Sequence, residues 1–285
     1  MGRAYAFMLR FEALSPILIG SGSRSGNIKE AFKIGKYYVI PASSWKGALR
    51  REVLVTANSM DLSGDVRELI AEHLKEKGEG EERSVVSFHE GTGCSSIPEI
   101  ASRNGEVDQE ALRKSIEPEL YHVIHESMGA DEAKAEICAA LKSFACPVDS
   151  IFGSMYFASM ANFSSSVFVG SPEYRTHASI DRETMAVSER HLFSEENVWP
   201  HGDVLLRVTL VLPERKELYG YARDPELMVA IWKKTLEKLA KHGLSIGAGK
   251  SRGLGLLKLK AGESLFMTLP ESGENYNWKS LDSFL

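Results

Sequence analysis

Hydrophobic and polar positions alternate along the N-terminal segment in the pattern of a β-strand. Between Arg3 and Leu14, one side carries the large residues Tyr5, Phe7, Leu9 and Phe11, and the other carries Ala4, Ala6, Met8 and Arg10. Successive side chains of a strand point to opposite faces, so this segment is predicted to bury one face. Similar patterns predict strands at residues 36–40, 156–169, 204–212 and 254–259.

Two segments between these strands have the pattern of helices. Ser43 and Ser44 precede the first, predicted from Trp45 to Val55, and a hydroxyl at this position accepts a bond from a free backbone N–H. Residues 224–242 form the second, a strongly amphipathic helix. The order strand–helix–strand–strand–helix–strand is that of a ferredoxin-like, or RRM-like, fold, so we predict an α+β protein.

Charge is distributed unevenly along the chain. The 34 basic and 39 acidic residues give a net charge of −5, which argues against a histone-like nucleic-acid binder. Residues 61–149 hold 20 of the acidic and 9 of the basic residues, so the rest of the chain has a net charge of +6. We interpret residues 59–150 as an acidic, solvated insertion with helices predicted at 66–77, 111–120 and 130–144.

The sequence predicts no membrane partner and a cytoplasmic location. It has no run of about 18 apolar residues, and its N-terminus lacks the apolar core of a signal peptide. Its three cysteines, an odd number in a long chain, are expected to be reduced rather than to form a disulfide scaffold.

A glycine-rich segment carries the most distinctive pattern. Residues 245–255 read SIGAGKSRGLG, with four glycines around Lys250, Ser251 and Arg252. We expect such a loop to approach a phosphate backbone closely, with N–H groups free to donate and no nearby acid in the sequence. It does not match a Walker loop, because it follows a helix and precedes a strand. An ordinary helix-to-strand turn remains the alternative.

Two further segments carry polar groups suited to RNA. The helix start with Ser43 and Ser44 is a natural phosphate site, and Lys46 and Arg50 share a face of that helix. Residues 175–193 are polar with scattered apolar positions, which predicts a long β-hairpin. The alternatives are a capped helix with a solvated basic face and a surface loop.

Together these segments resemble the RAMP superfamily of CRISPR-associated proteins, and more narrowly the backbone subunits of type III (Csm/Cmr-like) effector complexes. The motifs are IPASSWKGALR at 40–50, IFGS at 151–154, IDRET at 180–184 and the glycine loop at 247–255. Ala42 and Ile151 replace the glycine and leucine of the family pattern. The IFGS motif is the family's strand start.

The resemblance implies a ferredoxin-like palm at residues 1–58 and 151–262, with a thumb-like hairpin at 172–200 and a C-terminal tail at 263–285. It implies copies stacked along a guide RNA beside other CRISPR effector subunits, with Met185 or Val187 of the thumb separating bases of the guide–target duplex. The implied contacts to the RNA backbone are Ser43, Ser44, Lys46, Arg50, Arg182, Gly249, Lys250, Ser251, Arg252 and Gly253.

Catalysis by this subunit is expected to be weak or absent. The family cuts target RNA with a divalent metal and an aspartate just before the 40–50 motif, but residues 20–33 contain no aspartate. Glu30 is the only acid there, and Asn27 cannot act as a base. The alternatives are a metal-independent endoribonuclease that processes guide RNA, with His177 or His191 as base, and a structural adaptor that does not bind RNA. We expect both histidines to lie in the hairpin, away from the glycine loop.

A structural zinc site is a further hypothesis. His89, Cys94, Cys138 and Cys146 supply four nitrogen or sulfur ligands, the number that a structural zinc needs. Asp149 stands where some relatives have a second cysteine after Cys146, so the compact knuckle is absent. The alternative is that Cys138 is simply a buried thiol.

Overall fold

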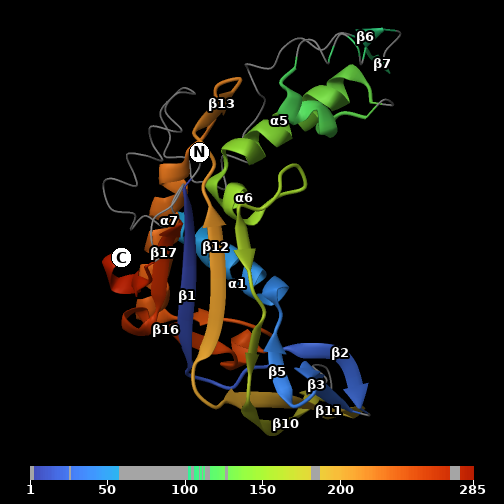
Figure 1. Ribbon diagram of the computed structural model, residues 1–285. Coiled ribbons are helices and arrows are strands. Elements are labelled where there is room, and N and C mark those ends of the chain that lie inside the picture. Colours follow the sequence, from blue (N-terminus) through green and yellow to red (C-terminus); the bar gives the residue numbers. More distant parts are fainter. Residues whose placement is uncertain are drawn as a thin grey trace, which may run out of the picture. The chain divides into compact units, whose positions relative to one another are not determined.

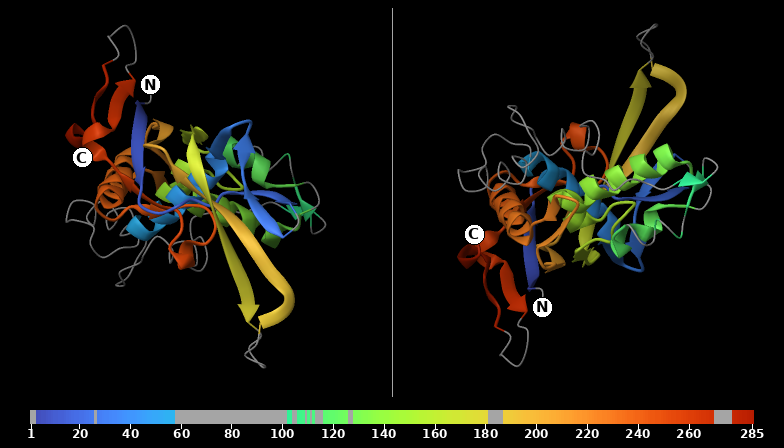
Figure 2. Two further views of the ribbon diagram at one scale, coloured as in Figure 1. Left: turned by 90° about the horizontal axis from the view of Figure 1, so that it is seen from below. Right: turned by 90° about the horizontal axis from the view of Figure 1, so that it is seen from above.

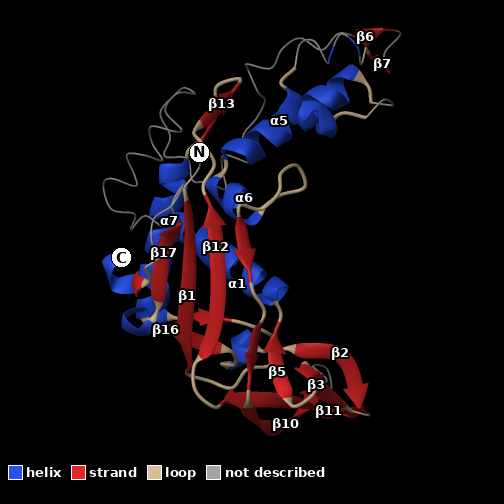
Figure 3. Ribbon diagram, viewed as in Figure 1, coloured by secondary structure: helices blue, strands red, loops and turns tan. Residues whose placement is uncertain are grey.

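The computed structural model describes residues 3–25, 27–57, 102–103, 106–108, 110, 112, 116–125, 128–180, 187–269 and 277–285. Helices and strands are mixed, which confirms the predicted α+β class (Figure 3). The chain divides into a helical unit (Met1–Arg3, Val53–Ala161 and Leu210–Lys234) and a sheet unit (Ala4–Glu52, Asn162–Thr209 and Thr235–Leu285). No helix among the described residues is long and apolar enough to span a membrane.

The main sheet has the strand order β15-β16-β1-β12-β8 (Figure 1). Its strands are β15 (Leu244–Ser245), β16 (Leu256–Leu259), β1 (Ala4–Ala13), β12 (Val204–Val211) and β8 (Ala161–Phe163). β17 (Leu265–Leu269) pairs with β1 and with β18 (Lys279–Ser280). The order β16-β1-β12-β8, with a helix after β1 and another after β12, is compatible with the predicted ferredoxin-like arrangement.

The alternating pattern of β1 buries one face of the strand, as predicted. Phe7, Leu9 and Phe11 are completely buried, and the ring of Phe11 lies 5.0 Å from that of Trp45 on α1 (Ala42–Ala57). The second predicted helix is α7 (Pro225–His242). An ion pair of 2.9 Å joins Lys238 of α7 to Glu52 of α1.

The strand predicted over residues 156–169 is wrong as a single element. The structure has two short strands, β8 and β9 (Ser166–Phe168), which belong to different sheets. Before them, the Ser154 hydroxyl accepts hydrogen bonds from the backbone N–H groups of Tyr156 and Phe157, which folds this part into a turn. Hydroxyl-to-backbone bonds of this kind compete with strand pairing.

Two smaller sheets complete the sheet unit. One has the order β10-β11-β3-β2, with β10 (Gly170–Ile180), β11 (Val187–Pro200), β3 (Ile28–Ala31) and β2 (Gly20–Ser25). The other joins β4 (Lys33–Ile34), β5 (Tyr37–Ile40) and β9. β10 and β11 form the predicted long hairpin, which extends as a two-stranded arm (Figure 2). Short 3-10 turns are η2 (Lys250–Arg252), η3 (Ala261–Glu263) and η4 (Leu281–Ser283).

The described part of the helical unit contains α5 (Ala130–Ala145), α6 (Pro147–Phe152), η1 (Pro118–Val123), and the strand pairs β6 (Ser102–Arg103) with β7 (Glu106–Val107) and β13 (Lys216–Leu218) with β14 (Tyr221–Arg223). The helix predicted at 130–144 is confirmed. The one predicted at 66–77 lies outside the described residues, and within 111–120 the structure places the start of η1.

A buried arginine packs against an aromatic ring in this unit. The Arg223 guanidinium lies 4.1 Å from the centre of the Phe144 ring, and burial lowers the pKa of this arginine.

The predicted strand start at residues 151–154 is wrong, because Ile151 and Phe152 end α6. Gly153 follows with a φ of +78°, where a Cβ would lie 2.9 Å from the Ser159 nitrogen.

Candidate nucleic-acid interface

The glycine loop is shaped by its packing against residues 14–19. All four glycines of the loop have positive φ. A Cβ on Gly255 would lie 1.9 Å from the Ile246 carbonyl oxygen, and one on Gly247 would lie 2.3 Å from the Leu18 oxygen. The fold itself therefore requires glycine at these two positions, whether or not a ligand approaches.

The expectation that the N–H groups of the loop are free is wrong for much of it. The Ala248 N–H donates to the Leu18 oxygen at 2.8 Å, and the Gly255 N–H donates to the Pro16 oxygen at 2.8 Å. The Arg252 N–H is used within the turn, where it donates to Gly249. The capacity of the loop for anions thus comes mainly from the side chains of η2, of which Lys250, Ser251 and Arg252 are all exposed.

A buried acid partly neutralises this loop, contrary to the sequence expectation. Glu195, on β11, is only 3% exposed, and its Oε2 lies 2.6 Å from Arg252 Nη2. The two residues are 57 positions apart, so no local charge count detects the contact. Arg252 is therefore held in place by an ion pair, whereas Lys250 projects from an exposed turn.

His177 lies beside the same carboxylate. Its Nε2 is 3.3 Å from Glu195 Oε2, and its ring is 5.3 Å from that of Phe193. The expectation that the hairpin histidines lie away from the glycine loop is therefore wrong for His177, because Glu195 contacts both His177 and Arg252. His191 lies on β11, and its side chain is outside the described residues.

Glu195, Glu196 and Asn197 form a run of buried polar residues that the sequence does not reveal. All three are at most 3% exposed. Glu196 contacts the other side of the hairpin from Glu195: it lies 2.7 Å from Lys33 Nζ and accepts a bond from the Tyr38 hydroxyl at 3.1 Å. The hydrogen bond to Glu196 raises the pKa of Lys33, and burial raises that of Tyr38.

The other predicted thumb residues are only partly described. Arg182 and Met185 lie outside the described residues, and Val187 begins β11.

In the loop before α1, Asn27 is exposed and Glu30 lies on β3 with partial exposure. The aspartate-free loop pairs with β11, because the Ser194 N–H donates to the Asn27 oxygen at 2.9 Å.

The start of α1 differs from the predicted cap. The helix begins at Ala42, so Ser43 and Ser44 lie inside its first turn rather than before it. The first N–H of the helix, that of Ala42, donates instead to the Ser165 hydroxyl at 3.1 Å. A distant serine provides the cap, and Ser43 remains exposed. Lys46 and Arg50 lie on α1 and are partly exposed.

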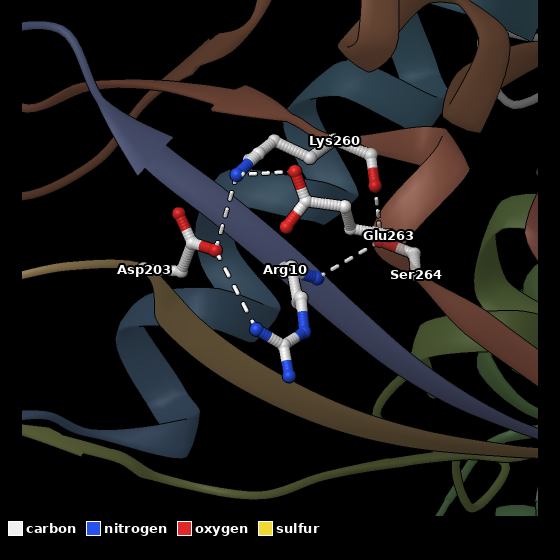
Figure 4. Close-up of polar contacts among 5 residues, drawn as sticks. All are labelled: Arg10, Asp203, Lys260, Glu263 and Ser264. Atoms are coloured by element: carbon white, nitrogen blue, oxygen red, sulfur yellow. Dashed lines mark hydrogen bonds and ion pairs between the residues drawn. The ribbon is translucent and has the colours of Figure 1, made fainter.

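A second polar cluster joins Arg10 of β1 to residues next to β12 and η3 (Figure 4). Asp203 is 3.6 Å from Arg10 and 3.4 Å from Lys260, and Lys260 also pairs with Glu263 at 2.5 Å. These contacts, with that to Glu263 the strongest, raise the pKa of Lys260. Acidic partners thus neutralise the positive charges of this cluster. The exposed η2 turn with Lys250 is therefore the better site for an anion.

The proposed zinc ligands receive no support. His89 and Cys94 lie outside the described residues. Cys138 is disulfide-bonded, which differs from the predicted reduced state and removes it from the set of thiolates, whereas Cys146 is a buried free thiol. Within the part of the chain that the structure describes, no group of three or more histidine, cysteine or acidic residues is placed to hold a metal ion.

Comparison with protein families then decides where the chain belongs. The model of the RAMP superfamily matches residues 10–258, which include the end of β1 and the whole of α1, β12, α7 and the glycine loop. The chain belongs to the RAMP superfamily. Membership of this superfamily associates the chain with CRISPR effector complexes. No curated protein matches the sequence.

Proposed function

We propose that this RAMP protein binds guide RNA as a backbone subunit of a type III CRISPR effector complex, in antiviral defence. The observation that carries the proposal is the exposed η2 turn with Lys250, held against β11 of the hairpin by the contact between Arg252 and Glu195. A cationic turn contacts phosphates without reading bases, and base pairing between guide and target supplies the sequence specificity.

In this role the chain binds RNA in several copies, next to other subunits of the complex and the target RNA. The β10–β11 arm is the proposed thumb that separates bases of the guide–target duplex. The structural adaptor remains the alternative class, and it predicts no RNA affinity.

RNA-length-dependent assembly tests the proposal. We expect the mass of the complex, measured by light scattering after size exclusion, to rise when a single-stranded RNA is doubled in length. Two unrelated sequences of equal length should give the same mass, because contacts to the backbone carry no sequence information. A mass that stays that of the free chain with every RNA would contradict the function and support the adaptor.

Cleavage of target RNA should be weak or absent in this subunit. Asn27 is neutral and stands near the position where the family has its aspartate, and Glu30 is the only acid of the loop. The charged oxygen that would bind a metal ion or act as a base is therefore missing at that position. We expect a guide-paired target to stay largely intact with Mg²⁺ or Mn²⁺. Efficient cuts at regular intervals would contradict this prediction.

One observation favours a second candidate, the metal-independent endoribonuclease. His177, Glu195 and Arg252 meet at one point, which places an imidazole and a guanidinium around one carboxylate. In this candidate His177 takes the proton of a 2′-hydroxyl, whose oxygen attacks the adjacent phosphorus and expels the 5′-oxygen of the next nucleotide. The released oxygen takes a proton from water, and Arg252 stabilises the charge on the phosphate.

The same cleavage assay with EDTA separates the candidates. The second candidate predicts products with 2′,3′-cyclic phosphate and 5′-hydroxyl ends that disappear in His177→Ala. His201→Ala is the matched control, because His201 is exposed and contacts Ser171 instead. Intact RNA after incubation in EDTA eliminates this candidate and leaves the binding function unaffected.

A further inference from the structure

One face of the β10–β11 arm carries a set of side chains that the proposed phosphate contacts do not explain. In the register of the two strands, His177 lies opposite Phe193 and Arg175 lies opposite Glu195. Directly paired residues share a face of a sheet, as do residues two positions apart in one strand. These four side chains therefore lie on the same face, which is also the face that Arg252 contacts through Glu195.

The two rings on this face form an exposed aromatic pair. The rings of His177 and Phe193 are 5.3 Å apart and tilted by 30° to each other. Phe193 is 38% exposed, and the side chain of His177 is 27% exposed. A phenylalanine exposed to this extent contributes little to the core, so its outer surface offers a flat apolar contact.

Two arginines lie beside the next pair on this face, Arg175 within it and Arg252 against its Glu195. The side chains of Arg252 and Arg175 are each 43% exposed, and each lies against one carboxylate, Glu195 and Glu173 respectively. Each contact engages one nitrogen of the arginine, and a guanidinium carries five N–H donors. Both arginines thus keep further N–H donors, which suit planar oxygen groups such as phosphates.

We propose that Phe193 and His177 form a stacking platform for one unpaired RNA base, whose flanking phosphates contact Arg252 and Arg175. This inference rests on the proposed RNA-binding function, and it adds that this face of the arm binds an unpaired base. Bases within an A-form duplex are stacked on one another, whereas an unpaired base has a free face. The pairing of an exposed ring with two fixed cations fits a polyanion whose bases stack, as in binding of single strands.

The salt dependence of RNA binding distinguishes stacking from charge. We expect Phe193→Leu to lower the affinity for single-stranded RNA by roughly tenfold while the dependence on salt is unchanged, because the ring carries no charge. Phe193→Tyr should retain the affinity of the wild type, because tyrosine keeps the ring. The matched control is Tyr37→Leu, which removes a ring that is 41% exposed on β5.

Photochemical crosslinking of the wild-type chain gives an independent readout that needs no variant to fold. The probe is a single-stranded RNA in which 5-iodouridine replaces uridine, because excited iodouridine couples to aromatic rings stacked on it. We expect the crosslinked peptide to contain Phe193 or His177, and not Tyr37. Binding of this RNA with no crosslink at either residue, and wild-type affinity in Phe193→Leu, would overturn the platform alone. No binding by the wild type would overturn the proposed function itself.

Discussion

Reversing the charge of Lys250 should lower the affinity of the chain for single-stranded RNA by about tenfold or more. Lys250 is exposed on η2, between two glycines that hold the turn in place. The variant Lys250→Glu removes a cation from the proposed phosphate site and adds a repulsive charge. The slope of log affinity against log salt should become shallower by about 0.7 for each phosphate that the variant no longer neutralises. Titration of labelled RNA at several salt concentrations measures both quantities.

A matched charge reversal elsewhere controls for net charge. Lys279→Glu makes the same change on β18, where the side chain is also exposed. Its effect on affinity should be small, because the change acts away from the proposed contact. Lys250 is a better probe than Arg252, because loss of Arg252 leaves the buried Glu195 without its ion pair and destabilises the fold. Equal effects of the two reversals would mean that η2 is not the binding site.

Gly255→Ala should destabilise the sheet unit by about 3 kcal/mol or more, because positive-φ strain and overpacking add together. The φ of Gly255 is +74°, and a Cβ there would lie 1.9 Å from a backbone oxygen that belongs to Ile246. Backbone atoms cannot move aside as a flexible side chain does, so the glycine loop must shift. Chemical denaturation measures the free energy of unfolding of the variant and of the wild type.

Gly253→Ala is the control for this prediction. Its φ is +79°, nearly the same, yet a Cβ there would meet nothing within 4 Å. Only the backbone strain applies, so we expect a loss of about 1–2 kcal/mol. Equal losses of stability in the two variants would contradict the packing of the loop against Ile246, and therefore the position of η2 beside β11.

The local parts of the fold are predictable from sequence because they depend on near neighbours. The alternation of Phe7, Leu9 and Phe11 predicts the buried face of β1, and the amphipathic pattern after Asp224 predicts α7. The long hairpin and the glycine loop also lie where their patterns indicate. The break between β8 and β9 is not predictable in this way, since the two strands pair with partners in two different sheets.

The candidate site is predictable only in part, because its key contacts join distant segments. Lys250 and Arg252 stand out in the sequence, but Glu195 reads as a surface residue of a polar strand and is in fact buried. Its contact with Arg252 changes the interpretation of the loop from an uncompensated basic turn to a positioned arginine next to an exposed lysine. The cap of α1 is similar, because Ser165 comes from another strand connection and no local pattern indicates it.

The central claim is that this RAMP protein holds RNA by its backbone through the face around η2. The most direct measurement is the affinity of the wild-type chain for two unrelated single-stranded RNAs of equal length, from low to high salt. We predict equal affinities for the two sequences and a log–log slope of about −0.7 for each phosphate contact. Absence of binding at low salt, or a strong preference for one sequence that salt does not weaken, would contradict the claim.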